Sequence, residues 1–85
     1  MEVTSMTIEG AEGPVVITRT KDGARVSAAG RVVCEMARDL HPDERFAAAL
    51  QSASAVYGTD RRGRARATNS MVHEVLDAIE RVAGC

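Results

Sequence analysis

The residues whose type and spacing are best suited to chemistry are four arginines close together in the second half of the chain. Arg61, Arg62, Arg64 and Arg66 flank Gly63 in a stretch of six residues. Guanidinium groups make paired hydrogen bonds with phosphate and carboxylate groups, so this cluster is suited to binding an anion or a nucleic acid. The alternative interpretation is a solvated loop, or a loop whose charges are neutralised by acidic helix faces of the same chain.

The residues that most often bind metal ions are scattered along the chain. They are Cys34, His41, His73 and Cys85. No C-x-x-C or H-x-x-x-H spacing joins them, and metal sites usually have such a spacing. We therefore expect no metal and no cofactor, and we expect both cysteines to remain reduced thiols rather than to form a disulfide.

Two further arrangements resemble catalytic ones, but each has a simpler structural explanation. Ser70 and His73 are one helical turn apart, as a nucleophile and its base could be, yet Ser70 also suits a helix cap. Carboxylates occur in two close pairs, Asp43/Glu44 and Glu74/Asp77. Both pairs fall where first turns of helices are expected, and negative charge there is stabilised by the helix dipole. The sequence therefore predicts that the chain is not an enzyme.

Composition describes a small chain with an aliphatic core. The 85 residues have a formal net charge of −1 and include one Phe, one Tyr and no Trp, which predicts a single domain over residues 1–85. A core of this size gives a small margin of stability, so a partner subunit is a plausible way to bury more surface. Neither a signal peptide nor a membrane span is recognisable, which favours a cytoplasmic protein without membrane contact.

The first third of the chain predicts a three-stranded antiparallel meander. Glu2–Glu9 alternates in polarity, Val15–Thr20 is rich in β-branched residues, and Asp22–Gly23 is a strong hairpin signal. A two-residue loop at that position pairs Arg19 with Val26. The apolar face that this register predicts consists of Val15, Ile17, Val26 and Ala28.

From Ala29 onward the apolar spacing predicts helices. Val32–Leu40 has helical periodicity, Pro42 starts a second helix that ends before Gly58, and a third follows a cap at Thr68, Asn69 or Ser70 and ends before Gly84. The predicted fold class is thus α+β, with a three-stranded meander followed by three helices packed on one sheet face. A helix-turn-helix is disfavoured because the second helix presents alanine and serine instead of basic side chains.

The helix that starts at Pro42 has an unusual composition, with no charged residue from Phe46 to Thr59. One face has Phe46, Leu50, Ala53 and Val56 or Tyr57. The opposite face is small and neutral, with Ala47, Ala48, Gln51, Ser52, Ser54 and Ala55. A helix that is neutral all round is usually covered on both sides. This pattern predicts that another copy of the chain, or another protein, contacts Ala48, Ser52 and Ala55.

Two functional hypotheses follow from these patterns. The first is a small non-enzymatic protein–protein interaction or regulatory module, acting as a homo-oligomer through its neutral helix face. The second is a nucleic-acid or anion-binding regulator that uses Arg61, Arg62, Arg64 and Arg66. Against nucleic acid, no aromatic residues interleave with the arginines for base stacking, and the rest of the chain is acidic.

Overall fold

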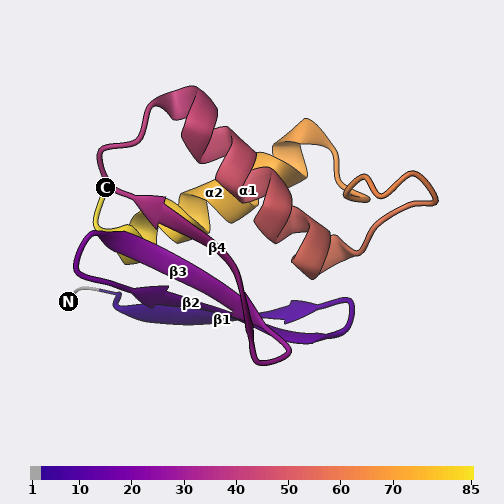
Figure 1. Ribbon diagram of the computed structural model, residues 1–85, viewed down its shortest axis with the longest axis horizontal. Helices are drawn as coiled ribbons and strands as arrows, with labels where there is room; N and C mark the ends of the chain where they lie inside the picture. The colour runs from indigo at the N-terminus through magenta and orange to yellow at the C-terminus, as the bar shows by residue number, and fades with distance from the viewer. Residues whose placement is uncertain (1–2) are drawn as a thin grey trace.

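A four-stranded antiparallel sheet with two helices on one of its faces makes up the fold (Figure 1). The computed structural model describes residues 3–85. The elements are β1 (Ser5–Gly10), β2 (Gly13–Arg19), β3 (Gly23–Ala28), β4 (Arg31–Ala37), α1 (Pro42–Tyr57) and α2 (Asn69–Ala83). The strands follow one another in the order β1-β2-β3-β4, α1 packs against β4 and β1, and α2 packs against β2 and β3. The core therefore lies between the inner face of the sheet and the helix pair.

The prediction of three strands and three helices is wrong, although the α+β class is that of the structure. The segment expected to be the first helix is β4, which pairs with β3 along its length. Ala29 and Gly30 have φ values of 53° and 75°, and two residues with positive φ form the tight hairpin turn that matches the twist of paired strands. The turn and the pairing with β3 outweigh the helical spacing of the apolar residues.

A bulge in β4 explains why its sequence resembles a helix. Cys34 lies opposite Val26 and Val32 lies opposite Ser27, so Val33 is an extra residue between the two pairs. Cys34 and Met36 point into the core, whereas Val32 is 57% exposed on the outer face. The bulge interrupts the alternation of inward and outward residues, and the apolar positions then mimic a helical period.

The hairpin between β2 and β3 differs from the predicted register by two residues. Arg19 lies opposite Ala24 and not Val26, while Ile17 lies opposite Val26. A shift of two residues leaves every side chain on its predicted face, so Ile17 and Val26 are still buried. The first residue of β3, Gly23, has to be glycine because a Cβ atom there would collide with the main-chain carbonyl of Met36. The predicted first strand began at Glu2, which lies outside the described residues; β1 begins at Ser5.

Both helices form where the local sequence predicts them. α1 has Pro42 in its first turn and ends at Gly58, whose N–H donates to the Ser54 carbonyl. α2 is capped by the Thr68 hydroxyl and ends at Gly84 in the left-handed conformation. The buried stripe of α2 comprises Val72, Val75, Leu76, Ile79, Val82 and Ala83.

α1 turns mainly small residues toward the core and turns Leu50 away from it. Its buried residues are Ala48, Ala49, Ser52, Ala53 and Val56. Leu50 is 41% exposed, and Phe46 is only half-buried. Small side chains allow a helix to approach its neighbours closely, so the alanine and serine face fits against the sheet and α2. The chain itself covers only one face of this helix, because Ala47, Leu50 and Gln51 are exposed, and covering of the other face by a partner stays a prediction.

Two arginine side chains connect the C-terminal end of α2 to the sheet by hydrogen bonds. Arg19 Nε donates to the Val82 carbonyl at 2.7 Å, and Arg38 Nη1 donates to the Ala83 carbonyl at 2.9 Å. The last carbonyls of a helix have no partner within the helix, and cations stabilise that end. These two arginines therefore satisfy groups that would otherwise require water.

Candidate anion-binding site

The arginine loop, defined here as residues 59–66, folds back on itself as a small closed hairpin between α1 and α2. Thr59 and Ala65 form an antiparallel bridge, and the Asp60 N–H donates to the Arg64 carbonyl at 2.8 Å. The Arg66 N–H donates to the Gly58 carbonyl at 2.9 Å, which ties the end of the loop to the end of α1. The loop is thus held by main-chain hydrogen bonds and projects from the body of the molecule (Figure 1).

Asp60 organises the tip of the loop. Its Oδ1 atom accepts hydrogen bonds from the N–H groups of Arg62 at 2.8 Å and Arg64 at 3.0 Å. The Gly63 N–H donates to the Asp60 carbonyl, and Gly63 has a positive φ of 76°. The bonds from Arg64 and Arg62 lower the pKa of the Asp60 carboxyl from its ordinary value of 3.8, because they stabilise the charged form. Asp60 is therefore ionised at neutral pH, and its carboxylate holds the loop by accepting these two hydrogen bonds.

Asp60 was not among the predicted site residues. An aspartate that precedes a turn commonly accepts hydrogen bonds from N–H groups two and more residues further along the chain. The sequence Asp60-Arg61-Arg62-Gly63 has this pattern, so the signal was present.

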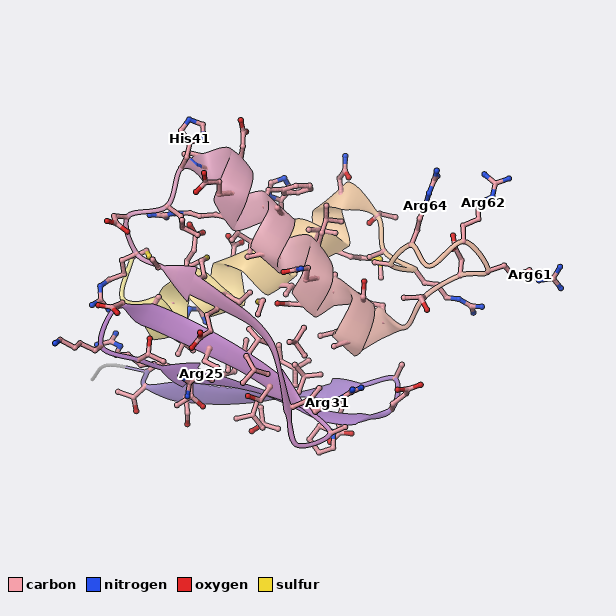
Figure 2. All side chains as sticks on the ribbon, viewed as in Figure 1. Arg25, Arg31, His41, Arg61, Arg62 and Arg64 are labelled. Atoms are coloured by element: carbon pink, nitrogen blue, oxygen red, sulfur yellow. The ribbon has the colours of Figure 1, made fainter. Side chains whose placement is uncertain are left out.

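Three of the four predicted binding residues have side chains directed into solvent. Figure 2 shows Arg61, Arg62 and Arg64 extending from the loop, away from the sheet and helices. All three are exposed, and within residues 3–85 no hydrogen bond or ion pair occupies their guanidinium groups. Arg66 differs, because its Nε donates to the Thr59 carbonyl at 3.0 Å and so contributes to closing the loop. In the described part of the chain, no acidic helix face neutralises these charges; the Asp60 carboxylate, within the loop itself, interacts electrostatically with Arg64 and Arg66.

A groove separates the loop from the exposed side of α1. It measures about 470 Å³, and its lining is Leu50, Gln51 and Ser54 from α1 with Gly63, Arg64 and Ala65 from the loop. The Ser54 hydroxyl donates to the Leu50 carbonyl at 3.2 Å, so it is already bonded within its own helix. The groove is therefore mainly apolar, with Arg64 in its wall.

The residues predicted to contact another chain lie largely inside this one. Ser52 is 0% exposed and Ala48 is 7% exposed, both covered by the chain's own fold, while Ala55 is half-buried. Ser52 Oγ donates to the Ala48 carbonyl at 3.0 Å and lies 3.0 Å from Cys34 Sγ on β4. The small residues thus pack against the sheet of the same copy. Homo-oligomerisation stays a prediction, but covering this face no longer requires a second copy.

The candidate metal ligands remain far from forming a site. Cys34 is buried in β4, where desolvation by burial raises the pKa of its thiol despite the hydrogen bond with Ser52. His41 caps α1 by accepting from the Asp43 N–H at 3.2 Å, and the His73 ring packs against Phe46 with centroids 5.2 Å apart. Over residues 3–85, no three His, Cys, Asp or Glu residues come together as a metal site would require.

The other catalytic candidates are positioned as surface groups. Ser70 lies in the exposed first turn of α2, and no hydrogen bond joins it to His73 in the described chain. The two carboxylate pairs likewise lie exposed on the helices: Asp43, Glu44, Glu74 and Asp77. An aligned nucleophile and base need a hydrogen bond between them and a third group that orients the base. This arrangement is not found at Ser70.

Comparison of the chain with protein-family models, with curated proteins and with solved structures gave no match. None of the helices within residues 3–85 is both long enough and apolar enough to cross a membrane.

Proposed function

We propose that the chain is a small non-enzymatic binding module that holds an anionic partner with its arginine loop. The observation that carries this proposal is the combination of an ordered loop backbone and unoccupied side chains. Asp60 and the Thr59–Ala65 bridge fix the loop, while the guanidinium groups of Arg61, Arg62 and Arg64 make no hydrogen bond or ion pair within residues 3–85.

Order in the loop backbone favours binding for an entropic reason. A binding loop that is already folded loses less conformational freedom when its partner arrives, and that saving adds to the affinity. The three guanidinium groups each present several N–H donors that match the oxygen atoms of carboxylates and phosphates. The loop therefore offers several charge-assisted hydrogen bonds at a small ordering cost.

Charge distribution also supports an anionic partner. The arginine loop holds four of the 11 basic residues, whereas the chain has 12 acidic residues in all. Positive charge is therefore concentrated in one projecting loop of a molecule whose other residues are, in sum, acidic. This asymmetry orients an approaching anionic partner toward the loop.

Fluorescence anisotropy with labelled polyanions tests the proposal. The probes are a polyglutamate peptide and a DNA duplex, each titrated at low and at physiological ionic strength. The test variant replaces Arg61, Arg62 and Arg64 with Gln. The control variant replaces Lys21, Arg31 and Arg81 with Gln; these three residues are exposed elsewhere on the molecule. Both variants lose the same number of positive charges, so a difference between them reports the location of the charge.

We expect at least one probe to bind the native chain, more weakly as salt is added, and the loop variant to bind it about tenfold more weakly. The control variant should retain most of the affinity. Equal losses in both variants, or no binding of either probe, would contradict the proposal.

A further inference from the structure

The groove beside the arginine loop indicates which class of anionic partner fits the molecule. Resting on the function proposed above, we propose that the anionic partner is a protein segment in which acidic residues flank an apolar side chain. The apolar side chain fills the groove between α1 and the loop, and the carboxylates reach the loop arginines. The groove, of about 470 Å³, has room for one or two such side chains.

The floor of the groove is suited to an apolar group. Leu50 is 41% exposed there, and it is the large apolar side chain that α1 exposes most. Ala65 adds a methyl group from the loop, and the Ser54 hydroxyl already donates to the Leu50 carbonyl. Covering Leu50 removes apolar surface from water and leaves no polar group of Ser54 unsatisfied.

Charge complementarity identifies the flanking residues of the partner. Arg64 belongs to the groove wall, and Arg61 and Arg62 extend beyond it on the same loop (Figure 2). On the other side of the groove, α1 carries no charge from Phe46 to its end at Tyr57. A carboxylate next to the apolar side chain therefore meets guanidinium groups on the loop and no repelling acid on α1.

The same features disfavour a nucleic acid. Proteins that bind single strands usually stack bases on aromatic side chains, but none of the residues lining the groove is aromatic. Proteins that bind a duplex usually present a basic face, whereas here the arginines occupy one loop of a chain with a net charge of −1. The apolar floor has no role in contacts with phosphates.

Two matched peptides test the proposal. Both are labelled and rich in glutamate; one carries two leucines one helical turn apart, and the other has alanine at those positions. A labelled DNA duplex is the third probe. Leu50→Gln is the test variant and Val32→Gln is its control, because Val32 is also exposed but lies on the outer face of the sheet. Leu50→Ala provides a second groove variant with a residue that favours helix.

We expect the leucine peptide to bind about fivefold more tightly than the alanine peptide, from partial burial of an apolar side chain. Leu50→Gln and Leu50→Ala should remove that advantage without weakening the alanine peptide, while Val32→Gln should preserve it. Equal affinities of the two peptides, or an advantage that survives both Leu50 variants, overturn this inference. Loss of binding in the loop variant would still support the proposed function in that case.

Two other outcomes also overturn the inference. Tighter binding of the DNA duplex than of either peptide identifies a nucleic acid as the partner, and leaves the arginine loop as the anion-binding site. Binding of none of the three probes contradicts both the inference and the function on which it rests.

Discussion

Arginines at the two ends of the molecule have different surroundings. At the end where α2 finishes, Arg19, Arg38 and Arg45 reach across elements and donate to main-chain carbonyls. At the other end, Arg61, Arg62 and Arg64 point into solvent (Figure 2). The side-chain chemistry is the same in both groups. Their surroundings decide that the first group stabilises the fold, whereas the second remains accessible to the anionic partner that we propose.

Arg45 shows how extensive the structural role is. Its Nε donates to the Leu40 carbonyl at 3.0 Å, its Nη2 donates to the Arg38 carbonyl, and its Nη1 pairs with Glu80 Oε2 at 2.8 Å. The Arg45 and Glu80 side chains are only 22% and 27% exposed, so the pair is screened less than a surface ion pair. One side chain thereby joins the start of α1, the segment before it, and α2.

The largest expected effect is on stability when Arg45 is replaced. Arg45→Ala leaves two carbonyls and the Glu80 carboxylate without their partner, and we expect it to lower the free energy of unfolding by about 2 kcal/mol. Urea denaturation followed by circular dichroism measures the change, with Arg62→Ala as the control. A loss for Arg45→Ala no greater than that for Arg62→Ala would remove the distinction between the two groups.

A second prediction concerns Asp60, whose carboxylate accepts hydrogen bonds from the loop backbone. Asp60→Ala removes the acceptor for the N–H groups of Arg62 and Arg64, so both amides should exchange with solvent faster. Binding of an anionic probe should weaken severalfold, because the loop then loses more freedom on binding. Amide exchange by NMR and anisotropy measure the two effects. Unchanged exchange at both amides would show that Asp60 does not order the loop.

The third prediction is a pH dependence confined to the loop. Because the pKa of Asp60 in the folded chain lies below its ordinary value of 3.8, ionised Asp60 stabilises the loop above that value. This contribution is lost as the pH falls through the lowered pKa. Amide chemical shifts of Arg62 and Arg64 should therefore stay constant from neutral pH to about pH 5 and change only in stronger acid. A transition near neutral pH would contradict the assignment of Asp60 as the group that orders these two amides.

The smallest expected effect is on the stability of the loop variant. Replacing Arg61, Arg62 and Arg64 together with Gln removes no hydrogen bond made by their side chains within residues 3–85. The free energy of unfolding should therefore stay within about 0.5 kcal/mol of the native value. The same urea series as for Arg45→Ala provides the comparison. A loss comparable to that of Arg45→Ala would assign the loop arginines a structural role.

Local signals in the sequence were sufficient to predict the bounds of α1 and α2 and the position of the arginine loop. Pro42, Gly58, Thr68 and Gly84 act through the conformation of their own backbone or its nearest neighbours. The charged loop between the helices was equally visible, because four arginines in six residues have no place in a core. These features depend on residues close in sequence.

Features that depend on distant parts of the chain could not be predicted in this way. The helical spacing of Val32, Val33 and Met36 is produced by a bulge whose position is set by pairing with β3. Likewise, the buried Ser52 hydroxyl lies 3.0 Å from Cys34 Sγ, and this contact depends on Cys34 being in strand β4 rather than in the predicted helix. The groove arises only once α1 turns Leu50 outward.

The most direct test of the central claim is an NMR titration of the native chain with the glutamate-rich leucine peptide. The account predicts that amide shifts change in two places: in the arginine loop, and at Leu50, Gln51 and Ser54 on α1. The outer face of the sheet, around Thr18 and Arg25, should show no change. Shift changes centred on the sheet, with the loop unaffected, would contradict the account.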